Sequence, residues 1–152
     1  MDRRGVLLLV ACIAGGWAVI ANSWYSAGAN SVGLFGVQLC SGWCELETWQ
    51  TLHAPYELLV LGGSTFLGVA HTIGFAVHAV IVVRKQQPAR VKVRWTIATA
   101  VATLAAGVAF LVRAPRLLPG VTMTVSYAPF LAFAATAALA VLTVRLRATS
   151  SS

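Results

Sequence analysis

Residues 24–49 read WYSAGANSVGLFGVQLCSGWCELETW, and this stretch lies between the first two apolar segments of the chain. It contains no Lys or Arg, although the whole chain carries a formal net charge of +7. Because basic residues favour the cytoplasmic side of a membrane, a loop without them is expected on the outside. Its two cysteines, Cys40 and Cys44, predict a small folded element outside the bilayer that is closed by a disulfide.

The composition is that of an integral membrane protein. Hydrophobic residues make up 59% and charged residues 10% of the 152 residues, and the mean hydropathy is +0.81. These values are too apolar for a soluble domain of this length. Crossing a bilayer takes roughly 20 apolar residues. We therefore predict a single four-span membrane domain over residues 1–152, with spans at about 6–21, 58–83, 95–112 and 128–144.

The basic residues predict the orientation. Of the 11 Lys and Arg residues, only Arg113 and Arg116 lie on the opposite side of the predicted spans from the rest. The positive-inside rule then places both termini and loop 84–94 in the cytoplasm, and loops 23–57 and 113–127 outside. A cleaved signal peptide over the first apolar segment is an alternative that the charges leave open. The positive charge is a topology signal that also favours anionic membrane lipid, and no nucleic-acid partner is expected.

Small residues at helical spacing predict that the spans pack closely as an all-α four-helix bundle. They recur in three of the spans, as Ser64, Gly68 and Thr72, as Thr99, Thr103 and Gly107, and as Ala128, Ala132, Thr136 and Ala140.

Two histidines, His71 and His78, share one face of the second span because they are seven residues apart. A haem held between helices would need a facing histidine, and the other three spans contain none. We therefore expect neutral histidines that hydrogen-bond a Thr or Ser of a neighbouring helix or line a wet crevice, with no cofactor and no metal.

The residues around the two cysteines predict a β-hairpin. Two arms, residues 31–40 and 44–49, are joined by three residues that include Gly42. Cys40 and Cys44 would then face each other within disulfide distance. Unpaired cysteines in an irregular loop are one alternative, and a thiol redox pair is another, although thioredoxin-like motifs have two intervening residues instead of three.

The second outer loop carries its own strand pattern. Residues 121–127 read VTMTVSY and alternate apolar and polar side chains after the breaker Pro119-Gly120. Because an isolated two-stranded hairpin is marginal in water, we expect this strand to join the first loop. The result would be a small extracellular antiparallel sheet with one apolar face on the helices.

With this topology the chain resembles the claudin and peripheral myelin protein superfamily of four-span proteins. The first outer loop of that family carries a Trp, a Gly-Leu-Trp motif and two cysteines. The matching positions here are Trp24, Gly33, Leu34, Phe35, Cys40 and Cys44. The resemblance implies a claudin-like, non-enzymatic protein of the plasma membrane. Its outer loops would self-associate in cis or in trans, in cell–cell adhesion or barrier formation.

Aromatic side chains of the outer loops are the expected contact residues, since Trp and Tyr are favoured at interfaces. The candidates are Trp24, Tyr25, Trp43, Trp49 and Tyr56. Trp43, at the hairpin tip, is the first choice for a partner contact. Trp24 and Tyr56 fall at the ends of spans, where an aromatic belt at the lipid headgroups is the alternative.

Glu45 and Glu47 share one face of the second arm because residues two apart on a strand point the same way. Both are candidate partner contacts. The resemblance to claudins implies a weak cation-selective role for them, and a solvated strand face is the simpler interpretation. Two other function classes remain open for the chain. One is an accessory subunit that binds an unlike channel, transporter or membrane enzyme, and the other is a membrane thiol redox protein.

Overall fold

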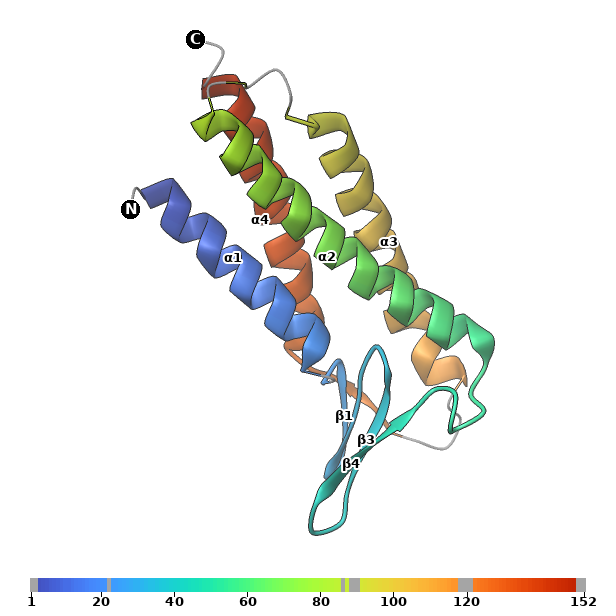
Figure 1. Cartoon of the computed structure of the whole chain (residues 1–152). Helices are drawn as coiled ribbons and strands as arrows, with labels where there is room; N and C mark the ends of the chain where they lie inside the picture. The colour runs from blue at the N-terminus through green and yellow to red at the C-terminus, as the bar shows by residue number, and fades with distance from the viewer. Residues whose placement is uncertain (1–2, 22, 86, 88–90, 118–121, 150–152) are drawn as a thin grey trace.

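The computed structural model describes the chain except for residues 1–2, 22, 86, 88–90, 118–121 and 150–152. In the described part, four helices form an elongated bundle and a small sheet projects from one of its ends (Figure 1). The helices are α1 (Arg3–Ile20), α2 (Tyr56–Arg84), α3 (Val93–Leu117) and α4 (Ala128–Thr149). The prediction of a helical bundle with a small antiparallel sheet is thus confirmed.

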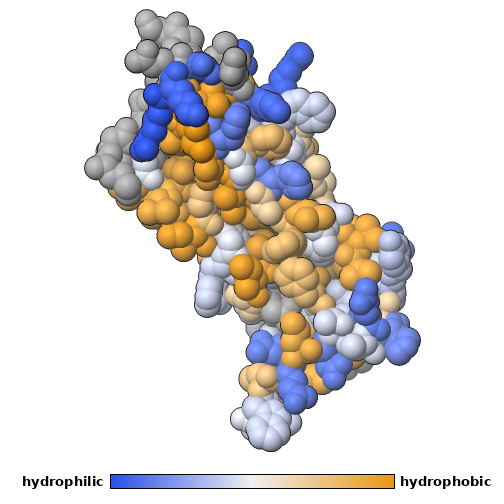
Figure 2. Space-filling view, viewed as in Figure 1, coloured by the Kyte–Doolittle hydropathy of each residue, from blue (hydrophilic) through white to orange (hydrophobic). Residues whose placement is uncertain are grey.

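Three of the helices, α2, α3 and α4, are long and apolar enough to cross a membrane. The apolar part of α1, Gly5–Ile20, is shorter. In the space-filling view, hydrophobic residues cover much of the bundle and hydrophilic residues gather toward its two ends (Figure 2). The start of α1 and the end of α4 lie at the end of the bundle opposite the sheet (Figure 1). This arrangement is compatible with both termini on one side of a membrane.

Glycines bring the helices together at two points. A Cβ on Gly68 would lie 2.1 Å from Thr103 Oγ1, and a Cβ on Gly107 would lie 2.5 Å from Phe133 Cε1. The missing side chains of these glycines allow α3 to approach α2 and α4 closely. The buried Thr hydroxyls donate to the carbonyl four residues earlier in the chain, which satisfies them without a partner helix. They are Thr65, Thr72, Thr96, Thr103, Thr136 and Thr143.

Helix α3 runs five residues beyond its predicted end at residue 112, so the predicted outer loop 113–127 begins inside a helix. The helix can continue because another group donates the hydrogen bond that a proline in its last turn cannot make. Pro115 has no N–H, so it cannot bond the carbonyl of Leu111 four residues earlier. The Tyr25 hydroxyl donates to that carbonyl instead. A contact from the sheet thus compensates the missing helix bond, and the helix continues through the proline.

The sheet contains β1 (Tyr25–Ala27), β2 (Asn30–Val32), β3 (Gly36–Cys40), β4 (Cys44–Thr48) and β5 (Thr124–Val125). Its order is β4-β3-β2-β1-β5, and every pair is antiparallel. The predicted hairpin is confirmed as β3–β4. Its first arm is divided at residues 33–35 by a turn that the Gly33 N–H closes on Gly36 O at 2.9 Å. The predicted strand 121–127 is confirmed only as β5, which pairs with β1, and residue 121 lies outside the described part.

The largest buried side chains gather where the sheet meets the bundle. Trp24, Tyr25, Trp49 and Phe110 are all at most 2% exposed. Trp24 meets Phe110 edge-on, with ring centroids 5.6 Å apart. Smaller side chains, mainly Ala, Val and Thr, fill much of the bundle interior. The heaviest packing therefore holds the sheet onto the helices.

Candidate functional site

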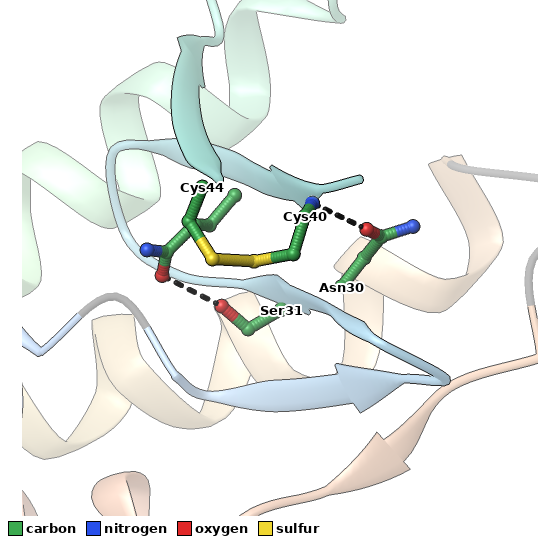
Figure 3. Close-up of a disulfide and its surroundings, with 5 residues drawn as sticks. Asn30, Ser31, Cys40 and Cys44 are labelled. Atoms are coloured by element: carbon green, nitrogen blue, oxygen red, sulfur yellow. Dashed lines mark hydrogen bonds between the residues drawn. A yellow bond between two sulfur atoms is a disulfide. The ribbon is translucent and has the colours of Figure 1, made fainter. Parts of the chain in front are cut away.

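The candidate site is the outer hairpin, which we define as residues 36–48. The predicted disulfide is present between Cys40 and Cys44, whose Cα atoms are 4.1 Å apart (Figure 3). Beside it, Asn30 Oδ1 of β2 accepts the Cys40 N–H at 2.9 Å. The Ser31 hydroxyl donates to Gln38 Oε1 at 3.3 Å. Covalent and hydrogen bonds thus tie both arms of the hairpin together and connect them to the next strand.

The tip of the hairpin presents a tryptophan to its surroundings. Gly42 has φ +105°, a conformation that side chains rarely adopt and glycine allows. The chain can therefore turn within three residues, and Trp43 follows with 76% of its surface exposed. Exposing a large apolar side chain to water costs free energy. An exposed Trp on a closed hairpin is therefore typical of a contact residue.

The hairpin also leaves one strand edge uncovered by any described strand, because β4 is the last strand of the sheet. The backbone bonds from Ser41 N–H to Trp43 O and from Trp49 N–H to Phe35 O show which residue pairs of β3 and β4 are hydrogen-bonded. Bonded and non-bonded pairs alternate in an antiparallel ladder. Leu46 therefore belongs to a non-bonded pair and directs its backbone N–H and C=O away from β3. Its side chain is also exposed.

The two glutamates of β4 lie on the same face of the hairpin, as expected. Glu45 stands opposite Leu39 and Glu47 stands opposite Val37. Glu45 is exposed and Glu47 is half-buried. Charged side chains on an end strand oppose unselective edge-to-edge pairing. The free edge is therefore open to a partner of matching shape but protected against indiscriminate aggregation.

Trp24 proves to be a buried anchor, which corrects the expectation of an exposed aromatic or a lipid-headgroup belt at this position. Its side chain is 0% exposed. The indole Nε1–H donates to Ala18 O at the end of α1, at 3.1 Å. Its ring meets Phe110 of α3 and, at 5.8 Å, Phe133 of α4. One side chain thus connects three helices to the start of the sheet.

Trp49 is also buried, at 2% exposure, so the expectation of an exposed side chain there is wrong. Its Nε1–H donates to Leu34 O at 2.8 Å. The same carbonyl rests on Gly62 of α2, where an added Cβ would lie only 2.1 Å away. We call this group, Trp24, Leu34, Trp49, Gly62 and Phe110, the sheet–bundle junction. Tyr25 is likewise buried, which removes it from the exposed candidates.

The Gly33-Leu34-Phe35 motif belongs to the same junction. Leu34 is buried, and the partly buried Phe35 ring meets Phe66 of α2 with centroids 5.1 Å apart. The motif therefore fastens the sheet to α2 and contributes no exposed surface of its own beyond part of Phe35. Gly62 and Phe110 are the residues of the sheet–bundle junction that sequence reasoning missed. No local signal distinguishes Gly62 from its neighbour Gly63.

The histidines of α2 lie on the outer surface of the bundle. His71 and His78 are exposed, and His71 donates its Nδ1–H to Leu67 O of its own helix at 2.7 Å. The expected bond to a Thr or Ser of a neighbouring helix is therefore wrong for His71. Both histidines line an open groove. Among the described residues, no three His, Cys, Asp or Glu side chains are grouped to hold a metal ion.

No family model, curated protein sequence or solved structure matches this chain.

Proposed function

We propose that the protein is a non-enzymatic, claudin-like integral membrane protein that acts through its outer hairpin. Its function would be cell–cell adhesion or barrier formation by self-association. The observation that carries this proposal is the 76% exposure of Trp43 at the tip of a disulfide-closed hairpin, while the other two loop tryptophans are buried. A rigid exposed aromatic is the type of residue that dominates protein interfaces.

In this proposal all four helices span the plasma membrane and both termini are cytoplasmic. The end of the bundle opposite the sheet carries Arg84, Lys85, Lys92, Arg94, Arg145 and Arg147. The sheet end has Arg113 and Arg116, and Arg113 lies 4.0 Å from Glu57. This asymmetry supports placing the sheet outside the cell.

Antiparallel pairing of β4 with the β4 of a second copy about Leu46 would set Glu45 opposite Glu47, which is unfavourable because like charges would face each other. The contact would therefore be made by the hairpin tips of two copies. Such a contact is self-complementary about a two-fold axis. Trp43 would then pack on the partner's hairpin, and Glu45 and Glu47 would lie on its flank.

The test mixes two cell populations that express the protein with different fluorescent labels and images their shared borders. We expect both labels to be enriched at mixed borders, and we expect Trp43→Ala to abolish this enrichment while the protein stays at the cell surface. Trp95→Ala is the matched control, because Trp95 is also an exposed tryptophan, at 67%, but lies near the start of α3 at the end of the bundle opposite the hairpin.

Other outcomes point to the other function classes. A uniform distribution together with co-purification of one unlike membrane protein would replace self-association by an accessory-subunit role. A Cys40–Cys44 pair that cycles between oxidised and reduced states while the protein works would instead support a thiol redox function. Enrichment that survives Trp43→Ala would remove the hairpin tip from the proposal.

A further inference from the structure

An open groove of about 430 Å³ lies on the outer surface of the second half of α2. Its lining is Ala70, His71, Gly74, Phe75, His78 and Lys92. The size falls within the range of small-ligand sites. Since α2 is long and apolar enough to cross a membrane, this outer groove would face lipid when α2 spans the bilayer.

The groove is polar at one end and apolar toward the middle of α2. Lys92 lies just before α3, at the end of the bundle where α2 ends with Arg84. His78 lies six residues before Arg84, which places it roughly 9 Å deeper at the helical rise. The Lys92 ammonium at the end of the bundle is placed to meet a lipid phosphate, and the deeper His78 imidazole is placed to meet the glycerol esters below that phosphate.

The middle of the groove is hollow because Gly74 has no side chain. A Cβ on Gly74 would meet no atom within 4 Å. Ala70 lies one turn deeper, and Phe75 forms part of the wall. An acyl chain can therefore lie along this surface. At the deep end, His71 has one ring nitrogen satisfied by Leu67 O within its own helix.

Charge decides between the candidate occupants. A second copy docked on this face about a two-fold axis along the membrane normal would bring the two Lys92 ammonium groups to the same depth on facing surfaces. Like charges in such an interface are unfavourable. An anionic lipid supplies the opposite charge at the polar end and an apolar chain for the remainder.

We propose that this groove is a binding site for one anionic phospholipid. Lys92 binds the phosphate, His78 donates to the phosphate or an ester oxygen, and one acyl chain lies over Gly74 and Ala70. The site is separate from the outer hairpin and does not depend on the function proposed for it.

The test places the full chain in nanodiscs that contain equal amounts of phosphatidylglycerol and phosphatidylcholine. The protein is then released from the nanodiscs, and native mass spectrometry identifies the lipid that stays bound to it. We expect one retained lipid, with phosphatidylglycerol preferred. Lys92→Gln should lower this preference about fivefold, which corresponds to about 1 kcal/mol for one basic residue near the surface. Lys85→Gln is the matched control, because Lys85 caps the same end of α2 but does not line the groove.

A second pair of variants tests the hollow. Gly74→Leu should reduce retention of both lipids, whereas Gly63→Leu, also in open space on α2, should not. Equal preference in wild type and Lys92→Gln would overturn the proposal. So would equal effects of Lys85→Gln and Lys92→Gln, which would indicate diffuse attraction. A dimer or an unlike protein that is lost on Gly74→Leu would also overturn it, because the groove would then be a protein interface.

Discussion

Replacing Gly62 by Ala should loosen the outer sheet from the bundle. The new Cβ would lie 2.1 Å from Leu34 O and 3.0 Å from Leu34 C, so the Leu34 backbone has to move until the closest of these contacts exceeds 3.0 Å. Overpacking of this kind costs about 1–3 kcal/mol. Moving Leu34 also strains its bond from Trp49, worth about 1 kcal/mol.

Alanine has a helix propensity up to about 1 kcal/mol better than that of glycine, which offsets part of this cost. We therefore expect the free energy of unfolding to fall by about 1–3 kcal/mol. Gly63→Ala is the matched control, since it receives the same propensity gain and its Cβ meets nothing within 4 Å. It should leave stability unchanged or raise it.

The assay is unfolding in mixed micelles with increasing sodium dodecyl sulfate, combined with hydrogen exchange of residues 24–49. Gly62→Ala should lower the midpoint and speed exchange in the sheet, while exchange in the middle of α3 and α4 stays slow. If Gly62→Ala and Gly63→Ala give equal midpoints and equal exchange in the sheet, the close approach of Leu34 to α2 does not exist.

Two further predictions concern Tyr25 and the disulfide. Burial raises the pKa of Tyr25 from 10 to about 12, so its neutral phenol stabilises the fold below pH 10, and this contribution of about 3 kcal/mol is lost as the pH rises from 10 to 12. Unfolding of Tyr25→Phe should be less pH-dependent in that window and about 1–2 kcal/mol easier at neutral pH, since Leu111 O loses its donor; parallel pH curves would refute this. Replacing Cys40 and Cys44 together by Ser should cost at most about 2 kcal/mol, because the closed loop is short. Exchange should then quicken in residues 36–48 but not at Trp49, and global unfolding of the sheet would contradict the separation of hairpin and junction.

The parts of the fold that could be predicted from sequence are those set by local pattern. Hydropathy alone predicts the four helices, and α2 differs from its predicted span by two residues at the start and one at the end. Alternation and the Cys40–Cys44 spacing predict the β3–β4 hairpin and its register. These features depend on neighbours in the chain, so a period and a turn residue suffice to identify them.

The errors arise where distant segments meet. The sequence predicts Trp24 and Trp49 at the surface because tryptophan is favoured at protein interfaces and, where it falls at the end of a span as Trp24 does, in membrane-interface belts. Their burial depends on Phe110, 86 residues from Trp24 along the chain, and on carbonyls of Ala18 and Leu34 that accept the indole N–H groups. Likewise, the sequence predicts that the third span ends at residue 112. The helix α3 continues through Pro115 because Tyr25, from a distant part of the chain, donates to the carbonyl that the proline leaves without a donor. No local pattern contains these contacts.

This division also separates residues that build the fold from those available for recognition. Every position of the Trp and Gly-Leu-Phe motif is wholly or partly buried in the sheet–bundle junction or its edges, so a substitution there acts first on the attachment of the sheet. A family resemblance carried by these positions is therefore evidence about architecture. In the function proposed above, partner choice would reside in side chains that the junction leaves free, foremost Trp43 and Leu46. Since their packing is not required by the described fold, they can change while the scaffold is kept.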